Sequence, residues 1–378
     1  MPFVRVFAAA FKPALAASIV VGSAAAGVSA WQYWRGDTPG PFERIQSQGQ
    51  LLVIAEFGRD ADMIVAVDPD DPSARTEIAR IGHAPEYGAF ATLSPDGRAI
   101  AYTALPKDTL RPGADAPAVA GIIETDGAVL RLADDVDLLI APVWAPDSSA
   151  IVVRRNLPRE NAAGAFELLR LGRDGSRRVM AESADAALFP IAFSPDGATL
   201  YVASLDVSGT DLLAVDAGAG GPTRIAHLSD EIARDWRLSP DGTMLAYTVA
   251  ESRPQPRVET LILHLTDGTV HDAASGSPGQ AEYSPAWSPD GALTMAALTR
   301  AGVAAAITVG ADGSTERLSG DRRALDQPLA WSPDGQALAV RTMEDAPDQA
   351  NHLEILMRDG ERRAVSDNAD VLVVGWLE

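Results

Sequence analysis

From residue 51 onward, short apolar stretches alternate with short polar ones along the whole chain. The apolar stretches are rich in β-branched, aromatic and small side chains, as in Met63–Val67 and Ala99–Thr103. Runs of this length and composition, bounded by Pro, Gly and Asp, are typical of β-strands. We therefore predict an all-β fold for this part of the chain.

One polar interruption, Ser-Pro-Asp-Gly, recurs through the sequence. Copies begin at Ser94, Ser194, Ser239, Ser288 and Ser332, and a degenerate copy runs from Ala145 to Ser148. Proline presets φ at the second position and glycine accepts positive φ at the fourth, so each copy predicts a tight turn between two strands. The aspartate is expected to cap backbone amides inside the turn. This is a structural role, and neither a catalytic nor a metal-binding role is predicted for it.

A second turn signal, Asp-Gly, follows one strand later. It occurs at Asp126, Asp174, Asp267, Asp312 and Asp359, in each case between two extended stretches. Asp-Gly in this setting is a strong signal for a β-hairpin. With both turns, each period of about 44 to 51 residues holds four antiparallel strands, which is the size and content of one β-propeller blade.

The two ends of this region together supply one further blade. Leu51–Ala55, Met63–Val67 and Thr76–Arg80 match the second, third and fourth strands of a blade, and Val371–Trp376 matches the missing first strand. Pairing the C-terminal strand with the N-terminal three closes the ring and removes exposed strand edges. We predict a seven-bladed propeller, with six or eight blades as alternatives.

The repeated Trp/Phe/Leu-Ser-Pro-Asp-Gly followed by a strand resembles the TolB-type, or WD40-like (PD40), β-propeller repeat. The resemblance covers Gln50–Glu378. It implies a periplasmic or cell-surface propeller that binds proteins or peptides. The chain departs from TolB, which is six-bladed with a separate N-terminal α/β domain, so TolB's own partner does not carry over. Similar propellers also cap prolyl-peptidase-type hydrolases, but no Gly-x-Ser-x-Gly elbow occurs here.

Residues 1–34 differ in character from the rest of the chain. Arg5 and Lys12 precede an uncharged run from Ala14 to Trp31. Its length suits a single transmembrane helix, and the preceding positive charge places the N-terminus in the cytoplasm. A secretory signal cleaved after small residues is the alternative, and either reading predicts an exported domain. Residues 35–50 are expected to form a linker, and residues 51–378 the propeller.

Composition narrows the function classes. The formal net charge is −21, which makes nucleic acid an improbable partner. The absence of cysteine excludes disulfides, thiolate metal sites and a lipid-modified cysteine. The five histidines show no zinc-ligand spacing. No catalytic motif is found, so we predict a protein that is not an enzyme and has no cofactor.

The order of turns assigns the connections to two faces of the propeller. The Ser-Pro-Asp-Gly and Asp-Gly turns share one face, which we call the turn face. The second-to-third connections and the crossings between blades share the other, which we call the loop face. Binding is expected on the loop face, because long loops there lie on a rigid scaffold. The longest are Pro106–Pro117, Pro158–Ala165, Glu251–Glu259 and Glu344–Asn351.

The crossings converge on the mouth of the central channel and are rich in acids. They hold three basic residues (Arg234, Arg322 and Arg323) and fourteen acidic ones: Glu86, Asp134, Asp135, Asp137, Glu182, Asp185, Asp230, Glu231, Asp235, Glu282, Asp321, Asp326, Asp367 and Asp370. This excess either attracts a cation, such as calcium, or a basic peptide, or simply solvates an acidic protein. The candidate channel-mouth binding residues, four or five positions before their turns, are Arg234, Asp235, Tyr283 and Gln327.

Two function hypotheses follow. The first is a membrane-tethered exported propeller that acts as a protein-binding or scaffolding module in an envelope or surface complex. The second is a propeller enzyme of the lactonase or sugar-dehydrogenase type, with carboxylates around calcium at the channel mouth.

Overall fold

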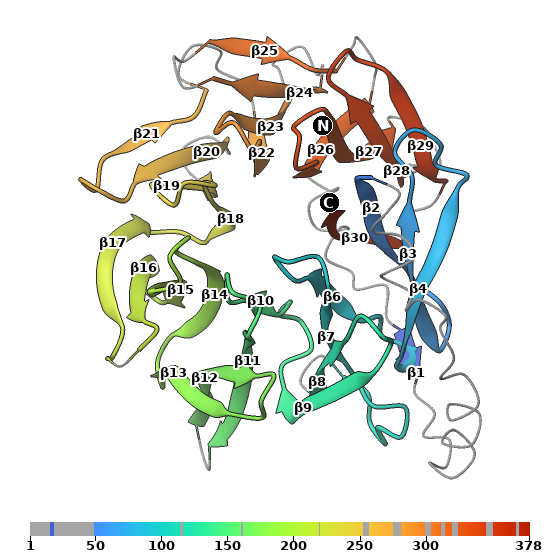
Figure 1. The fold of residues 1–378 in the computed structure, drawn as a ribbon. Helices are drawn as coiled ribbons and strands as arrows, with labels where there is room; N and C mark the ends of the chain where they lie inside the picture. Colours follow the sequence, from blue (N-terminus) through green and yellow to red (C-terminus); the bar gives the residue numbers. More distant parts are fainter. Residues whose placement is uncertain are drawn as a thin grey trace, which may run out of the picture.

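The computed structural model describes residues 16–18, 49–113, 116–159, 162–218, 220–251, 257–274, 281–298, 304–310, 314–319, 324–344, 351–367 and 370–378. Every regular element in these residues is a β-strand, which confirms the all-β prediction. The sheets follow one another around a ring with an opening in the middle (Figure 1). The first strand of each repeat lies nearest this opening and the fourth lies outermost (Figure 1).

Five sheets are four-stranded antiparallel blades. In order from the channel outward, their strands are β30 (Val371–Leu377), β2 (Leu51–Glu56), β3 (Ala61–Val67) and β4 (Arg75–Gly82); β6 (Phe90–Leu93), β7 (Ile100–Ala104), β8 (Ala118–Ile123) and β9 (Val129–Val136); β10 (Val143–Trp144), β11 (Ala150–Arg159), β12 (Ala162–Gly172) and β13 (Arg177–Ser183); β14 (Ala187–Phe193), β15 (Thr199–Asp206), β16 (Gly209–Asp216) and β17 (Thr223–Ser229); and β26 (Ala324–Trp331), β27 (Ala337–Glu344), β28 (Asn351–Met357) and β29 (Arg362–Ser366).

The remaining repeats form one mixed eight-stranded sheet. Its strands are β18 (Ala233–Leu238), β19 (Met244–Glu251), β20 (Arg257–His264), β21 (Val270–Asp272), β22 (Ala281–Trp287), β23 (Leu293–Leu298), β24 (Ala304–Val309) and β25 (Thr315–Arg317). The two antiparallel halves are joined by a single parallel pair, Val258 with Ala281. This pair forms where the short strand β21, which reaches only Leu261 to Leu263 of β20, leaves the start of β20 uncovered.

The chain ends close the ring, as the sequence predicts. Strand β30 pairs antiparallel with β2 from Leu51 opposite Leu377 to Glu56 opposite Val371. The first sheet therefore contains one strand from the C-terminus and three from the N-terminal part of the propeller. No edge of β2 is left open, since β3 occupies its other side.

The core is divided among the interfaces between neighbouring repeats. The described residues form seven buried apolar clusters, and each contains side chains from two successive repeats. Indole groups add hydrogen bonds across three of these interfaces. Trp144, Trp287 and Trp376 each donate Nε1–H to a backbone carbonyl of the preceding repeat, on Thr92, Arg237 and Ala330 respectively. These indoles therefore connect neighbouring repeats through both packing and hydrogen bonds.

The Ser-Pro-Asp-Gly turns are built as the sequence predicts. In the copy at Ser239, the hydroxyl donates to Asp241 Oδ1 at 2.6 Å, and the same carboxylate oxygen accepts from the Thr243 amide at 3.0 Å. Gly242 has φ of +72°. The Ser194 and Ser332 copies repeat these contacts. The aspartates therefore cap the turns, because their oxygens satisfy amides that the strand ladder leaves unpaired.

One predicted loop is wrong. Pro158–Ala165 was expected to be a long irregular connection, but β11 and β12 continue as a hairpin to the pair Arg159 with Ala162. The strand-forming residues on either side extend the ladder past the proline, with a register shift between Leu157 and Arg159 that accommodates its missing donor.

The predicted membrane segment falls mostly outside the described residues. Within it, Ala16–Ser18 form β1, which pairs antiparallel with β5 (Ala84–Glu86) in the first crossing between blades. In the part of the chain that the structure describes, no helix has the length and apolar character needed to cross a membrane.

Candidate functional site

The central channel is lined by the innermost strand of each repeat (Figure 1). Three successive inner strands, β18, β22 and β26, carry polar side chains on the channel segment that precedes the turn. We call this set the polar arc; its members are Arg234, Asp235, Arg237, Tyr283, Ser284 and Gln327. Strand β22 contacts both β18 and β26, so the three strands form one continuous stretch of wall.

The other four repeats have apolar residues at the positions that match Arg234 and Asp235. Counted back from the turn, the equivalents of Arg234 are Ala89, Ile140, Phe189 and Leu372, and those of Asp235 are Phe90, Ala141, Pro190 and Val373. We call this set the apolar arc. The sequence therefore gives the channel one polar and one apolar side.

Bulges reshape the polar arc at one position. Asp235 and Ser284 stand four residues before their turns in neighbouring repeats, and each has φ of +55°. The strand register shifts there, between Arg234 and Arg237 in β18 and between Tyr283 and Ala286 in β22. A bulge redirects the side chains beside it, and left-handed backbone is unfavourable for residues other than glycine. The same strained conformation therefore occurs at equivalent positions of two neighbouring repeats.

The structure brings the four sequence-predicted residues into two adjoining groups. Arg234 Nε lies 3.9 Å from Asp235 Oδ2. Burial raises the pKa of Tyr283, and the nearby Arg234 opposes this rise, so these two side chains are neighbours. Gln327 Nε2 donates to Ser284 Oγ at 2.7 Å, which connects β26 to the residue next to Tyr283.

Arg237 belongs to this site, and the sequence prediction missed it. It stands two residues before its turn, where the other inner strands have Thr92, Val143, Ala192, Ala286, Ala330 and Gly375. Its side chain is exposed, yet desolvation lowers its pKa, with Asp235 opposing. Arg237 lies on the innermost strand of its repeat, two residues after Asp235. Comparing the same position across repeats would have found it.

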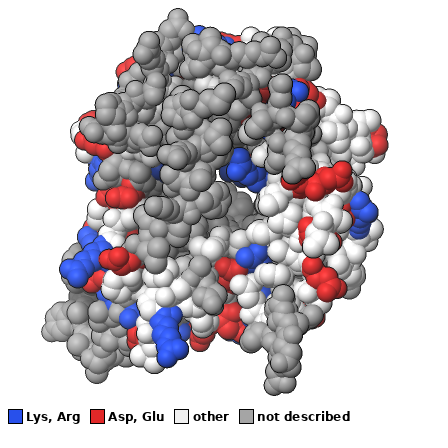
Figure 2. Space-filling model, turned by 180° about the vertical axis from the view of Figure 1, so that it is seen from behind, with Lys and Arg blue, Asp and Glu red and all other residues white. Residues whose placement is uncertain are grey.

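The acidic crossings are less negative than their composition indicates. Six of the fourteen acids are paired in the described residues: Asp134 with Arg131, Asp135 with Arg155, Asp137 with Arg154, Asp230 with His227, Asp235 with Arg234 and Asp326 with Arg362. Most of these cations come from strands, which the count of crossing residues left out. Figure 2 shows Lys and Arg atoms bordering a hollow near the middle of one face, with Asp and Glu around them.

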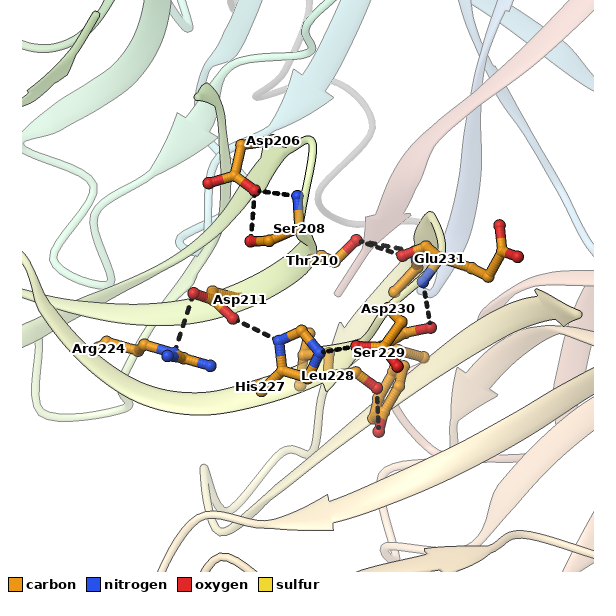
Figure 3. A network of polar contacts seen from close by, with 12 residues as sticks. Asp206, Ser208, Thr210, Asp211, Arg224, His227, Leu228, Ser229, Asp230 and Glu231 are labelled. Carbon is orange, nitrogen blue, oxygen red and sulfur yellow. Dashed lines mark hydrogen bonds and ion pairs between the residues drawn. The ribbon is translucent and has the colours of Figure 1, made fainter. Parts of the chain in front are cut away.

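A second polar network lies at the loop-face end of β16 and β17 (Figure 3). His227 contacts Asp211 through Nδ1 at 2.7 Å and Asp230 through Nε2 at 2.9 Å. Arg224 pairs with the second oxygen of Asp211 at 2.9 Å. A carboxylate faces each ring nitrogen, and this arrangement favours the imidazolium, which can donate from both nitrogens. Accordingly, the hydrogen bonds to Asp211 and Asp230 raise the pKa of His227.

No metal centre is apparent among the described ranges. No group of three or more His, Asp or Glu side chains there comes close enough together to hold a metal ion. The calcium site of the second hypothesis therefore stays a prediction from the sequence.

Comparison with known proteins adds information on the fold. No protein-family model matches the sequence, and no curated protein matches it. Among solved structures, TolB from Acinetobacter baumannii is 17% identical over 97% of this chain and 88% of its own, with a TM-score of 0.48.

Two further structures superpose more closely. An oligogalacturonate lyase solved with manganese is 12% identical over 84% of this chain and 85% of its own, with a TM-score of 0.56. A Bacteroides fragilis protein provisionally described as a 6-phosphogluconolactonase is 14% identical over 86% of this chain and 97% of its own, with a TM-score of 0.54. Identities this low show the fold alone. The chain is a β-propeller with structural matches to TolB and to enzymes built on related propellers.

Proposed function

We propose that the chain is an exported, membrane-tethered β-propeller that binds a protein or peptide partner on its loop face, as a module of an envelope or surface complex. The observation that carries this proposal is the placement of exposed apolar side chains. Large exposed apolar groups lose contact with water when a partner covers them, and each contributes about 1.5 to 3 kcal/mol when fully buried.

The exposed large apolar side chains of the described residues fall into two groups. Four lie on the outermost strands of their repeats: Val129, Val179, Ile225 and Val270. The other five all lie in loop-face connections: Phe57, Leu110, Leu139, Val207 and Ile232. Leu110 and Val207 are essentially fully exposed, at 98% and 108%. Exposed apolar groups on one functional face support a binding surface.

The charges beside these tips suit a basic partner. Val207 and Ile232 flank the network of Figure 3, where Asp206, Asp230 and Glu231 are exposed. Cationic side chains on a partner would find both an apolar contact and a complementary charge there. This agrees with the expected basic character of the partner.

We further infer that the mixed sheet represents two blades, which makes seven. A single parallel pair joins its halves, and a buried apolar cluster lies between them, as it does between separate blades elsewhere. The seven clusters match the seven interfaces of a closed ring of seven.

Site-specific photocrosslinking in intact cells tests the binding face. A crosslinker at Val207 is expected to trap one discrete partner, and the same group at Val270, on an outer strand, is the matched control. The substitution Val207→Asp should reduce crosslinking from a second probe at Ile232 by at least fivefold. Equal crosslinking from Val207 and Val270, or none from either, would refute the loop face as the binding surface.

Membrane extraction tests the tether separately. The full-length chain should stay with membranes after carbonate washing, and a chain beginning at Gln50 should be released. A released full-length chain with a shortened N-terminus would identify a cleaved signal instead. This result would leave the binding face standing, because the crosslinking does not depend on the tether.

A further inference from the structure

Arg237 is unusual for its place in the ring. The backbone carbonyl at this position receives an indole hydrogen bond from the next repeat, and Thr92 and Ala330 perform the same task. A small or apolar side chain at this position is therefore sufficient for the indole hydrogen bond between neighbouring repeats. The guanidinium is an addition that the fold does not require.

This guanidinium is underused by the protein. In the described part of the chain its one hydrogen bond goes from Nη1 to the carbonyl of the adjacent Trp236, at 2.9 Å. No carboxylate among these residues lies within ion-pair distance of it. A guanidinium has five N–H donors, so most of its donors have no acceptor among the described residues. A desolvated cation without a carboxylate gains most from an anionic ligand.

Other polar side chains lie on the same wall. Arg234 and Tyr283 lie on the same side of the channel, one on β18 and one on β22. Gln327 is held by Ser284 across the next interface, which fixes its orientation. The strained bulges at Asp235 and Ser284 set the direction of this group.

The opposite wall is different in character. Four members of the apolar arc are partly exposed: Phe90, Ile140, Pro190 and Val373. A ligand that fills the channel would meet the cation of Arg237 on one side and hydrocarbon on the other.

We propose that the polar arc binds a carboxylate carried on an apolar group, with Arg237 as its main ionic partner. The ligand is a monoanion, because Asp235 already balances part of the charge of Arg234 and the whole chain carries −21. A guanidinium also matches the planar carboxylate with two parallel hydrogen bonds. The carboxylate comes either from the C-terminus of a peptide or from a free small organic acid. These residues are distinct from the loop tips of the proposed partner face.

Isothermal titration with small probes tests this site directly. The tripeptide acetyl-Ala-Ala-Leu with a free carboxylate should bind at least tenfold more tightly than its C-terminal amide. Arg237→Gln should weaken binding of the acid by about ten- to hundredfold, the usual range for a charged hydrogen bond. Arg237→Lys should retain an intermediate affinity. The matched control is Arg98→Gln, which removes an exposed arginine on the turn face and should change nothing.

The source of the carboxylate is read from a second titration. If 4-methylpentanoate binds as tightly as the peptide, the ligand is a free small acid; if it binds much more weakly, the ligand is a peptide terminus. Equal affinities for peptide acid and amide, no binding of any probe, or an unchanged affinity in a folded Arg237→Gln variant would overturn the proposal. Thermal melting of each variant establishes that it is folded.

Discussion

At the scale of single residues, Arg154 connects three successive repeats. Its guanidinium donates to Asp137 Oδ2 through Nε at 2.9 Å and to the Leu188 carbonyl at 3.3 Å. It also lies over the rings of Phe166 and Phe189, at 5.2 and 4.7 Å from their centroids. Both charged groups are buried, so each depends on the other to offset its lost hydration.

Replacing Arg154 should therefore be costly. Arg154→Leu is expected to lower the free energy of unfolding by about 3 to 5 kcal/mol, because Asp137 would remain buried without its counter-ion. Urea denaturation measures this change. Arg170→Leu is the control, since Arg170 makes an exposed hydrogen bond to Ser149 and should cost about 0.5 kcal/mol or less. Similar costs for the two variants would contradict the assigned role.

The pKa values of His227 and His271 should be shifted in opposite directions from the ordinary histidine value. The hydrogen bond that His227 donates to Asp211, helped by the one to Asp230, raises the pKa of His227. Burial, helped by His264, lowers the pKa of His271. NMR titration should place the two histidines on either side of the ordinary value near 6.5. Asp211→Asn should lower the pKa of His227 and leave that of His271 unchanged.

The direction of the shift at His227 fixes its effect on stability. Because its folded pKa is above its unfolded value, its stabilising contribution is complete below about pH 6.5 and is lost as the pH rises through the folded pKa. Unfolding measured from pH 6 to pH 9 should show this loss in the native protein and less of it in His227→Gln. An identical pH dependence in both would argue against the contribution.

At the scale of the repeating elements, two turn glycines with the same backbone differ in their surroundings. Gly242 has φ of +72°, and a Cβ there would lie 2.4 Å from Pro195 Cδ of the preceding repeat. Gly268 has φ of +73°, and a Cβ there would meet nothing within 4 Å. The first glycine therefore serves both turn geometry and blade packing, and the second serves turn geometry alone.

Alanine substitutions should separate these two effects. Gly268→Ala should cost about 1 to 2 kcal/mol, the price of left-handed backbone with a side chain. Gly242→Ala should cost about 1 to 3 kcal/mol more, since the new methyl overpacks the blade interface. Chemical denaturation of both variants compares them directly. Equal costs would show that Pro195 moves aside freely.

The repeating elements were predictable because their signals are local. The turn at Ser239 is determined by the six successive residues Ser239–Met244, and its hydrogen bonds stay within them. The polar arc was only partly predictable, because the bulges at Asp235 and Ser284 change which inner-strand residues reach the channel. Sequence alternation alone gave no sign of these bulges, and Arg237 was missed for that reason.

The ion pairs of the channel-mouth acids could not be predicted from the sequence, for a different reason. Asp137 and Asp326 were counted as acids of the crossings, but Arg154 and Arg362 on neighbouring strands neutralise them. These partners lie 17 and 36 residues away in sequence. Such pairs depend on the register between strands, which composition does not contain.

At the scale of the whole molecule, closure of the ring by β30 should control cooperative unfolding. A chain ending at Asp370 would lose Val371, Val374 and Leu377 from the buried clusters on both sides of the first sheet. We expect this truncation to unfold at least 10 °C below the full chain, or to aggregate through the open edge of β2. Calorimetry of both chains measures the difference. Removal of Glu378 alone, which is exposed, should have no effect.

The pairing of β2 with β30 also bears on how the protein is made. Synthesis proceeds from the N-terminus, so β2 leaves the ribosome long before the strand that completes its sheet. Throughout that interval the backbone groups along one edge of β2 are unpaired. They can pair with the same strand of another nascent chain. Until β30 has been synthesised, this early segment therefore depends on protection from other chains.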